Sequence, residues 1–535
     1  MSKTAPTALL SVYDKAGIEK FAAELAGLGW QLLGSRGTCT YLAERDIKCR
    51  DAAELIGEPV LGHRVVTLSR GLHAALLSRD TKEDRRELKR IGVPRIDLVC
   101  IDLYPLERAV AAADGDEASV IEQTDIGGPT LLRSAAKGRR IAVSHPAQRA
   151  AVVEWLKADR PDGAAVRRAL AAEAEKACAR YALVSAGYLS EGKVSGQVGQ
   201  SVRELKYGEN PWQVPAHHLS LKTDDPLALD RFELLAGAEP GWCNLTDADR
   251  LLQTVTHIAA GFDANFGAVP SIAVAAKHGN ACGAAASPDG PADALVKAVR
   301  GDARAIFGGA VMVNFALGEA LAETLLRSDM PDGKKRKLDT VCAPEFSDAA
   351  AEMLTKRGCR LLANPALATL TRDSLDAAPL TRSVRGGFLR QPNFTQVIDL
   401  KDPDTVAAGD FDPRLAPDLV LAWAVGATSS SNTVCVIRDG MLLGNGMGQM
   451  DRVTAARHAV DKAREAGHTT AGAVGYSDSF FPFADALLAL GDAGVRTVLS
   501  CSGSVNDERV RAAALDAGLT LVLVPHVKAR GFYGH

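Results

Sequence analysis

The stretch Ser271-Ile-Ala-Val-Ala-Ala-Lys277-His278-Gly-Asn280-Ala-Cys282-Gly283 places an apolar run directly before a pair of reactive side chains. The run is short, continuous and followed by glycine, which predicts a buried β-strand. In α/β folds ligands collect at the carboxyl ends of strands, so Lys277 and His278 are well placed for chemistry. An ammonium group beside the imidazole disfavours its protonation and keeps His278 available as a proton acceptor. The alternative is that both residues only cap a strand in solvent.

The composition is that of a globular protein with more than one domain. A chain of 535 residues is too long for a single hydrophobic core, so about two to four domains are expected. A net charge of −3 leaves no electrostatic footprint for nucleic acid or an acidic membrane. No apolar stretch approaches the ~18 residues of a membrane span, and the N-terminus lacks the form of a signal peptide. The ten cysteines include no Cys-x-x-Cys pair, which predicts reduced thiols, a cytoplasmic location and no zinc cluster.

The first 200 residues alternate strand-like and helical patterns. Strands are predicted at residues 9–13, 31–34, 64–68, 98–103 and 141–144. The first helical pattern has one buried stripe, formed by Ile18, Phe21, Ala22, Leu25 and Leu28. Strands that alternate with helices are joined by right-handed crossovers and form a mostly parallel sheet. We therefore assign residues 1–190 to an α/β domain.

Two strand–helix turns of this domain carry groups suited to phosphate. In Ser11-Val-Tyr13-Asp14-Lys15-Ala-Gly17 the free backbone N–H groups and the positive helix end face one point, where Lys15 adds charge. In Gly34-Ser35-Arg36-Gly37-Thr38 a second turn supplies hydroxyl, amide and guanidinium groups. The alternative for each turn is a simple N-cap by Asp14 or Ser35.

A glycine-rich helix start, Thr124-Asp125-Ile126-Gly127-Gly128-Pro129, lies further along the chain. Pro129 suits a first helical turn, and the glycines let backbone approach a ligand closely. Asp125 precedes this helix and Lys137 lies along it, although tight packing explains the glycines equally well. A small, polar and glycine-rich segment then predicts a linker at residues 191–205.

Residues 206–535 predict a second region with a weak internal repeat. Thr246 is expected to cap a helix there. A second strand with a glycine-rich loop, at residues 433–452, is similar to the opening stretch and suggests two similar subdomains that share one cleft. The glycine spacing is not Gly-x-Gly-x-x-Gly, so no dinucleotide site is predicted. Asn432 directly precedes this strand and is expected to lie near His278.

Several motifs run in one order nearly from end to end. They include Asp-Leu-Tyr-Pro-Leu at 102–106, Asp-Ile-Gly-Gly-Pro-Thr-Leu-Leu-Arg-Ser-Ala-Ala-Lys at 125–137, Tyr-Gly-Glu-Asn-Pro at 207–211, Lys-His-x-Asn-x-Cys-Gly at 277–283 and Ser-Asp-Ser-Phe-Phe-Pro-Phe at 477–483. In these motifs the chain resembles the bifunctional purine biosynthesis proteins with AICAR transformylase and IMP cyclohydrolase activity.

The resemblance implies an α/β protein with a methylglyoxal-synthase-like parallel-sheet domain and a C-terminal domain of two cytidine-deaminase-like subdomains. The C-terminal domain would move a formyl group from 10-formyltetrahydrofolate to AICAR, giving FAICAR, and the first domain would close FAICAR to IMP. The resemblance also implies a homodimer with transformylase sites across the interface. It implies no catalytic metal, no nucleic acid and no membrane among the partners.

Carried over to this sequence, the resemblance assigns three catalytic residues. His278 would take the proton of the attacking amine, Lys277 would assist at the formyl group, and Asn432 would orient the folate or the oxyanion. The residues that would bind the transformylase substrates are Lys206, Tyr207, Gly208, Asn210, Phe307, Gly308, Asp339 and Arg530. The pocket of the first domain would comprise Ser11, Lys15, Ser35, Gly37, Thr38, Arg64, Thr67, Asp102, Tyr104, Asp125, Ile126, Gly127 and Lys137.

The sequence also departs from the family pattern. The first domain has Val66 in place of a lysine and Asp102 in place of an asparagine, and both changes disfavour the negative charge that builds during ring closure. In the second region Ala281, Trp212, Lys206, Asp451 and Ala427 replace family residues. We therefore expect weak or absent cyclohydrolase activity. Two alternatives stay open: a paralogue that binds a purine precursor without turnover, and a formyltransferase with another acceptor or one-carbon donor.

Overall fold

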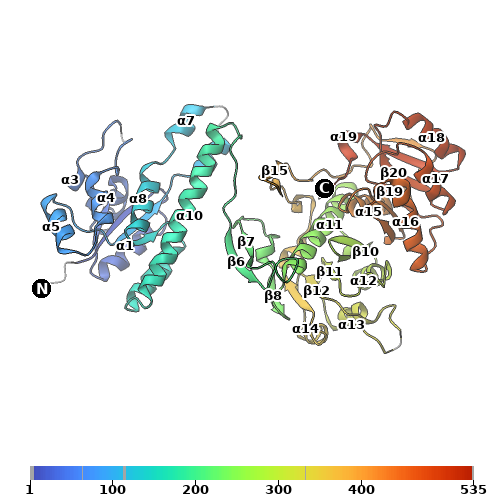
Figure 1. Cartoon of the computed structure of the whole chain (residues 1–535), viewed down its shortest axis with the longest axis horizontal. Helices are drawn as coiled ribbons and strands as arrows, with labels where there is room; N and C mark the ends of the chain where they lie inside the picture. Colours follow the sequence, from blue (N-terminus) through green and yellow to red (C-terminus); the bar gives the residue numbers. More distant parts are fainter. Residues whose placement is uncertain (1–4, 63, 113–115, 332, 533–535) are drawn as a thin grey trace. The chain divides into compact units, whose positions relative to one another are not determined.

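The structure is a computed structural model that describes residues 5–62, 64–112, 116–331 and 333–532. The chain forms two compact units, Met1–Gly199 and Gln200–His535, whose elements are labelled in Figure 1. The boundary falls inside the segment predicted as a linker. Part of that segment is a strand, because β6 (Gln200–Leu205) pairs with β7 (Ala216–Ser220) in a separate hairpin.

The first unit contains a five-stranded parallel sheet of order β3-β2-β1-β4-β5. Its strands are β1 (Thr7–Val12), β2 (Gln31–Gly34), β3 (Arg50–Asp51), β4 (Leu98–Asp102) and β5 (Ile141–Val143). Its helices are α1 (Ile18–Gly27), α2 (Arg36–Ala43), α3 (Ala53–Ile56), α4 (Arg70–Leu77), α5 (Lys82–Arg90), α6 (Leu106–Ala112), α7 (Glu117–Glu122), α8 (Gly127–Lys137), α9 (Gln148–Lys157) and α10 (Gly163–Leu189). The predicted α/β class with a parallel sheet is confirmed.

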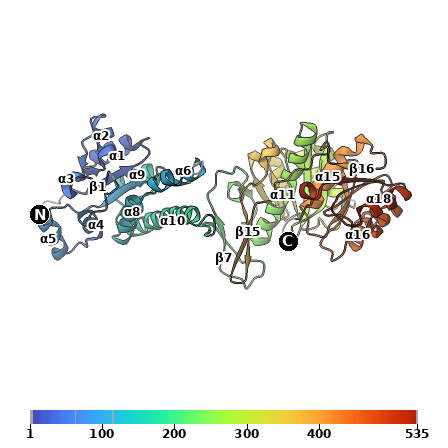
Figure 2. The same cartoon turned by 90° about the horizontal axis from the view of Figure 1, so that it is seen from above.

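Both faces of this sheet are buried. Alternate residues of β1 enter different cores: Ala8 and Leu10 join the core under α1 and α9, whereas Leu9 joins the core under α4, α8 and α10. Helix α10 packs along α8 (Figure 2). The predicted stripe of α1 is buried as far as Leu25, but Leu28 is 38% exposed because it is the C-cap of the helix.

The strand predicted at residues 64–68 was wrong. Val60 and Val65 form only an isolated bridge, and Ser69 already caps α4 by accepting a hydrogen bond from the Gly71 N–H at 3.1 Å. Within this segment Thr67 is buried, whereas Leu68 is exposed. The β-branched residues therefore imitate a strand, but among the described residues their pairing stops at this single bridge.

The second unit is built on a 12-stranded mixed sheet of order β16-β21-β20-β19-β17-β18-β10-β9-β11-β12-β13-β8. The strands are β8 (Glu233–Ala236), β9 (Ser271–Lys277), β10 (Asn280–Ser287), β11 (Ala310–Val313), β12 (Thr340–Ala343), β13 (Arg360–Ala363), β16 (Val406–Ala408), β17 (Val434–Arg438), β18 (Met441–Gly446), β19 (Val474–Ser477), β20 (Thr497–Cys501) and β21 (Thr520–Val524). A separate hairpin joins β14 (Leu380–Val384) and β15 (Gly387–Gln391).

The sheet contains an internal repeat. The first copy runs β8-α11-β9-β10-α12-β11-α13-β12-α14-β13, and the second runs β16-α15-β17-β18-α16-β19-α17-β20-α18-β21. The helices are α11 (Trp242–Phe266), α12 (Pro291–Arg300), α13 (Glu319–Arg327), α14 (Asp348–Thr355), α15 (Ala416–Ala427), α16 (Arg452–Glu465), α17 (Asp485–Asp492), α18 (Asp507–Asp516) and the short α19 (His526–Ala529). The copies meet where β10 pairs with β18 in antiparallel register, with Ala285 opposite Met441. The two copies therefore have the same order of strands and helices.

Helices α11 and α15 share the core on one face of the large sheet, and the outer helices of each copy bury the other face. The start of α11 differs from the prediction. Gly241 is the N-cap and Asn244 Oδ1 accepts the Gly241 N–H, so Thr246 lies inside the helix. The side chain of Thr246 instead donates back to the Trp242 and Cys243 carbonyls. Among the helices of the described residues, none has the length and apolar character to span a membrane.

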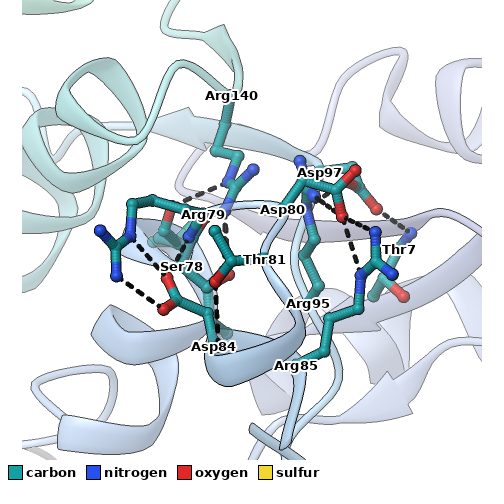
Figure 3. Close-up of polar contacts among 12 residues, drawn as sticks. Thr7, Ser78, Arg79, Asp80, Thr81, Asp84, Arg85, Arg95, Asp97 and Arg140 are labelled. Atoms are coloured by element: carbon teal, nitrogen blue, oxygen red, sulfur yellow. Dashed lines mark hydrogen bonds and ion pairs between the residues drawn. The ribbon is translucent and has the colours of Figure 1, made fainter. Parts of the chain in front are cut away.

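A buried guanidinium fixes the edge of the first unit that lies at the amino ends of its strands (Figure 3). Arg140 is 3% exposed, and its Nε donates to the Leu76 carbonyl at 2.7 Å while its Nη2 donates to Ser78 Oγ at 3.0 Å and to the Ser78 carbonyl. These groups lie at the C-terminal end of α4, where carbonyls lack helical partners. Burial lowers the pKa of Arg140 to about 10, and the charge of Arg95 acts in the same direction.

Replacing Arg140 with methionine should therefore destabilise the first unit. The substitution fills most of the volume but leaves buried carbonyls without donors, so we expect the free energy of unfolding to fall by about 2–4 kcal/mol. Urea unfolding of the full chain, followed by hydrogen exchange of peptides from residues 5–199, measures this. The control is Arg139→Met, because Arg139 is exposed and adjacent. Equal destabilisation by the two substitutions would contradict the prediction.

Candidate functional site

The β9–β10 hairpin presents His278 on a two-residue turn. Lys277 pairs with Asn280, and the two residues between them have positive φ angles, 53° for His278 and 72° for Gly279. This is the geometry of a type I′ turn, whose twist matches that of the flanking strands. Glycine adopts it freely, and histidine is among the side chains seen there more often than most.

Side chains of α11 hold this turn from both sides. Asp247 Oδ1 accepts the Gly279 N–H at 2.7 Å, and Arg250 Nε donates to the Gly279 carbonyl at 3.0 Å. Asn280 Nδ2 donates to the His278 carbonyl at 3.2 Å, and Asn280 Oδ1 accepts the Ser430 N–H at 3.0 Å. Burial raises the pKa of Asp247, while the Gly279 N–H and the nearby His278 act in the opposite direction.

A cavity of about 470 Å³ opens beside the turn. Its lining comes from the turn, the first turns of α11, the loop after β6 and the segment before β17: His278, Gly279, Asn280, Trp242, Cys243, Thr246, Asp247, Arg250, Glu209 and Ser430. The lining thus combines two carboxylates, a guanidinium, an imidazole and an indole. Such a mixture binds a polar, partly charged ligand and can move a proton.

Lys277 lies next to this cavity but does not line it. Its ammonium donates to the Phe307 carbonyl at 2.7 Å. Gly308 has a φ of 68° and donates its N–H to the Lys337 carbonyl, and a Cβ at this position would lie 4.0 Å from Asp339 Oδ1. The structure therefore brings together Lys277, Phe307, Gly308 and Asp339, with the Phe307 ring exposed.

Asn432 is fixed by a buried ion pair. Its Nδ2 donates to the Gln449 carbonyl at 2.9 Å, and its Oδ1 accepts from Arg452 Nη2 at 2.8 Å. Arg452 also bonds Asp478 Oδ1 at 2.5 Å, where the Asp478 side chain has no exposed surface. Ser430, two residues before Asn432, lines the His278 cavity, and Asn432 is not among the lining residues.

The sequence analysis did not single out Arg452. The sequence signal that could have pointed to Arg452 is the residue before it. Asp451 is the N-cap of α16 and accepts the Thr454 N–H at 2.8 Å. Asp451, which replaces a family residue, thus has a structural partner in Thr454. Hydrogen bonds to Thr454 also lower the pKa of the Asp451 carboxyl.

The remaining predicted transformylase residues divide between two places. In the loop after β6, Lys206 lies 5.8 Å from the Tyr207 ring, and the Gly208 and Asn210 N–H groups both donate to Gln213. This loop reaches the cavity through its Glu209. Arg530 instead stacks on Phe532 at 4.1 Å, and the next residue, Gly531, donates its N–H to the Asp478 carbonyl at 3.0 Å.

In the first unit both predicted phosphate turns lie at the carboxyl edge of β1 and β2. Thr38 Oγ1 accepts from the Val12 N–H at 3.3 Å and from Ser35 Oγ at 3.2 Å, and Ser11 lies on the same strand as Val12. The Lys15 ammonium turns inward and donates to the Val12 and Tyr13 carbonyls.

A carboxylate faces the first of these turns. Asp102 Oδ2 accepts the Asp14 N–H at 2.9 Å. Burial lowers the pKa of Lys15, while the charges of Asp102 and Asp14 raise it. The Asp102 carboxylate therefore already accepts the backbone N–H of Asp14, and its negative charge partly neutralises Lys15. The sequence analysis had assigned Lys15 to an anionic ligand.

Asp125 and Thr67 meet at the start of α8. Asp125 Oδ1 accepts the Gly128 N–H at 2.8 Å, and burial raises the pKa of this carboxyl. A Cβ on Gly127 would lie 2.4 Å from Thr67 Oγ1, so only glycine fits there without movement. Tyr104 contacts Tyr13 edge-on with ring centroids 5.3 Å apart, and burial raises its pKa.

Three further residues of the predicted pocket have exposed side chains. Arg64 is exposed and pairs with Glu122 at 2.9 Å. Lys137 is exposed in the last turn of α8, about 15 Å along the helix from Gly127 at 1.5 Å per residue. Ile126 is exposed at the N-cap of the same helix. In the described residues no group of three or more His, Cys, Asp or Glu side chains is arranged to hold a metal ion.

Comparison with known proteins gives two family matches. The family described as AICARFT/IMPCHase bienzyme matches residues 135–462, more than half of the 535 residues. The family described as MGS-like domain matches residues 17–130, which lie in the parallel-sheet unit. Among solved structures, a chain titled "Crystal structure of ForH" is 34% identical, and the match covers 35% of this chain and 100% of that chain with a TM-score of 0.31.

The contact between Gly127 and Thr67 can be tested by a double substitution. Gly127→Ala alone should lower the free energy of unfolding by about 1–3 kcal/mol, because the added methyl overlaps the Thr67 hydroxyl. Thr67→Ala in the same chain should recover most of this loss, and urea unfolding of the four variants gives the coupling. Gly37→Ala is the control, since nothing lies within 4 Å of that Cβ. Additive effects at Gly127 and Thr67 would show that the two positions do not touch.

Proposed function

Because this chain belongs to the AICARFT/IMPCHase bienzyme family of purine biosynthesis, we propose that it transfers the formyl group of 10-formyltetrahydrofolate to the 5-amino group of AICAR, giving FAICAR. The observation that carries the proposal is the position of His278, which a clamped turn presents to a cavity with mixed charge. An arylamine is a weak nucleophile, and a positioned base that removes its proton contributes typically ~10²–10⁴ in rate.

In this reaction the amine nitrogen attacks the formyl carbon, and His278 takes the proton that the nitrogen loses. Negative charge then develops on the formyl oxygen and needs preorganised donors. As this adduct collapses, the bond from the formyl carbon to the folate nitrogen breaks, and tetrahydrofolate leaves with a proton on that nitrogen. Lys277 is the nearest cation along the chain, and its hydrogen bond to the Phe307 carbonyl sets its direction. Asn432 keeps one side-chain N–H beyond the bond to Gln449, because its oxygen is held by Arg452. That remaining N–H suits a folate or oxyanion contact.

Exposed apolar side chains support a folate as the formyl donor. Met450, Phe483, Val505 and Val527 are all exposed and follow β18, β19, β20 and β21. These four strands run in the same direction, so the residues lie along one edge of the second repeat copy. A flat, aromatic pterin ring system is a ligand that such a rim would bind.

A homodimer is part of the same proposal. The β14–β15 hairpin forms a two-stranded sheet of its own, and Val384, Phe388 and Leu389 on it are exposed. An isolated two-stranded hairpin is marginally stable in water. In a homodimer, a second copy of the chain would bury these exposed apolar side chains.

For the first unit we propose weak or absent conversion of FAICAR to IMP. Ring closure builds negative charge on the formyl oxygen, which a cation stabilises and a carboxylate opposes. At the two family positions this chain has Val66 and Asp102, and the Asp102 carboxylate already bonds the Asp14 N–H beside Lys15. The hydroxyl cluster of Ser35 and Thr38 would still suit a phosphate.

Formyl transfer is tested by turnover of AICAR with 10-formyltetrahydrofolate. We expect the wild-type protein to form FAICAR, and His278→Ala to lower kcat about 10²–10⁴-fold. His458→Ala is the matched control, because His458 is an exposed histidine of α16. Full activity of His278→Ala would remove the proposed base. Binding of AICAR without FAICAR formation would favour the non-catalytic paralogue, and turnover with another amine or donor would favour the changed specificity.

Ring closure is tested with FAICAR as the substrate. The wild-type chain should form IMP slowly or not at all, and the double substitution Val66→Lys with Asp102→Asn should raise the rate at least about tenfold, the equivalent of ~1.4 kcal/mol of charge stabilisation. Asp14→Asn serves as the control for a general loss of negative charge near Lys15. Rapid IMP formation by the wild-type chain would refute the proposal for this unit.

A further inference from the structure

We propose that Asp247 and Arg250 are positioning residues that hold the His278–Gly279 turn in the conformation that presents the imidazole to the cavity. The inference rests on the proposed formyl transfer and adds the two residues that make His278 effective. Neither residue needs to touch the reacting atoms for this role.

The turn needs external support, because His278 has a φ of 53°. A residue with a Cβ is disfavoured in this left-handed region, so hydrogen bonds from neighbouring residues add to the support that the hairpin itself gives. Asp247 binds the N–H and Arg250 binds the carbonyl of the same residue, Gly279. Both peptide groups of Gly279 are thus fixed from one helix, and the plane of the preceding His278 peptide is fixed with them.

Close packing adds to the hydrogen bonds. A Cβ on Gly279 would lie 3.1 Å from Arg250 Cγ. Arg250 Nη2 also donates to the Thr428 carbonyl at 2.9 Å, at the C-cap of α15. Arg250 therefore ties the His278 turn to the second repeat copy, whose Ser430 lines the same cavity.

The second repeat copy provides an internal comparison. Its β17–β18 turn is formed by Asp439 and Gly440, with φ angles of 53° and 69°. Asp418 of α15 accepts the Asp439 N–H at 2.9 Å and the Gly440 N–H at 2.7 Å. The aspartate clamp is thus a property of the fold that both copies share.

The arginine is found in one copy only. Three residues after Asp247 the helix has Arg250, whereas three residues after Asp418 it has the fully buried Leu421. The Gly279 carbonyl is therefore held by a charged side chain, whereas the corresponding Gly440 carbonyl accepts the backbone N–H of Ala286 at 3.1 Å. Because the second turn forms without an arginine, the hairpin itself does not require one, and this favours a role for Arg250 at the site.

The charge of Asp247 is suited to the same role. Its carboxyl group feels the charges of His278 and Lys277 on the turn and of Asp339 on the neighbouring segment. When the imidazole accepts a proton from the amine, a carboxylate in this place offsets the new positive charge.

The kinetic test uses Asp247→Asn, Arg250→Gln and Arg250→Lys, with Asp418→Asn as the matched control. Asparagine and glutamine keep the side-chain size but remove the charge and the strongest hydrogen bonds. We expect Asp247→Asn and Arg250→Gln to lower kcat up to about 100-fold with KM for AICAR within about threefold. Arg250→Lys should recover part of the loss, and Asp418→Asn should leave kcat within about twofold.

A second readout does not depend on activity. Hydrogen exchange of peptides that contain residues 277–280 should rise in Asp247→Asn and Arg250→Gln, and Asp418→Asn should raise exchange at residues 438–441 instead. Unchanged kcat together with unchanged exchange at 277–280 would overturn the clamp. Faster exchange with unchanged kcat would also overturn it, because the turn would then be only structural.

The two proposals can fail separately. A wild-type chain that does not formylate AICAR removes the proposed function, and the clamp is then judged by exchange at residues 277–280 alone. A wild-type chain that is active, with variants that change KM but not kcat, keeps the formyl transfer and rejects the positioning role.

Discussion

The antiparallel contact between β10 and β18 is the constraint on which the second unit depends. It joins two six-stranded halves into one sheet, with Ala285 opposite Met441 and the Ala286 N–H bonded to the Gly440 carbonyl at 3.1 Å. Because the strands run in opposite directions, the turn before β10 comes to the end of β18. The Asn445 side chain completes the junction by donating to the Ala281 carbonyl at 3.0 Å. His278 therefore reaches Ser430 only through this pairing.

Small residues make the contact feasible. A Cβ on Gly283 would lie 1.9 Å from the Ala298 carbonyl of α12, and one on Gly444 would lie 2.0 Å from the Ala459 carbonyl of α16. Gly446 has the same relation to Ala455. The glycines of this stretch thus let each helix lie directly on its strand, which explains a spacing that fits no dinucleotide motif. The inner face is closed in the same way, since a Cβ on Gly261 would lie 2.7 Å from Val420.

The sequence predicted what local patterns determine. Apolar runs and their alternation with helices identified the parallel sheet, the β9 strand and the repeat. The sequence could not predict the pairing of distant strands, such as β10 with β18. The small residues of these strands do not indicate which strand lies beside them. The strand predicted at 64–68 failed for the opposite reason: the pattern was present without a partner. The same distinction applies to the site. The His278 turn follows from local sequence, whereas the bonds from Arg250 to Gly279 and from Arg452 to Asn432 are tertiary contacts that no local pattern predicts.

The two edges of the duplicated scaffold differ in the described residues. At the edge beside β10, Asp293 accepts from Ser287 Oγ at 2.5 Å and pairs with Lys297 at 2.6 Å, and a Cβ on Gly440 would lie 2.5 Å from the Ala286 carbonyl. Polar groups there bond one another, although the Asp439 side chain itself is exposed. At the opposite edge, beside the end of β18, the His278–Gly279 turn borders a cavity that Glu209 and Asp247 also line. That edge, with its mixed polar and charged lining, is therefore where we propose that the ligand binds.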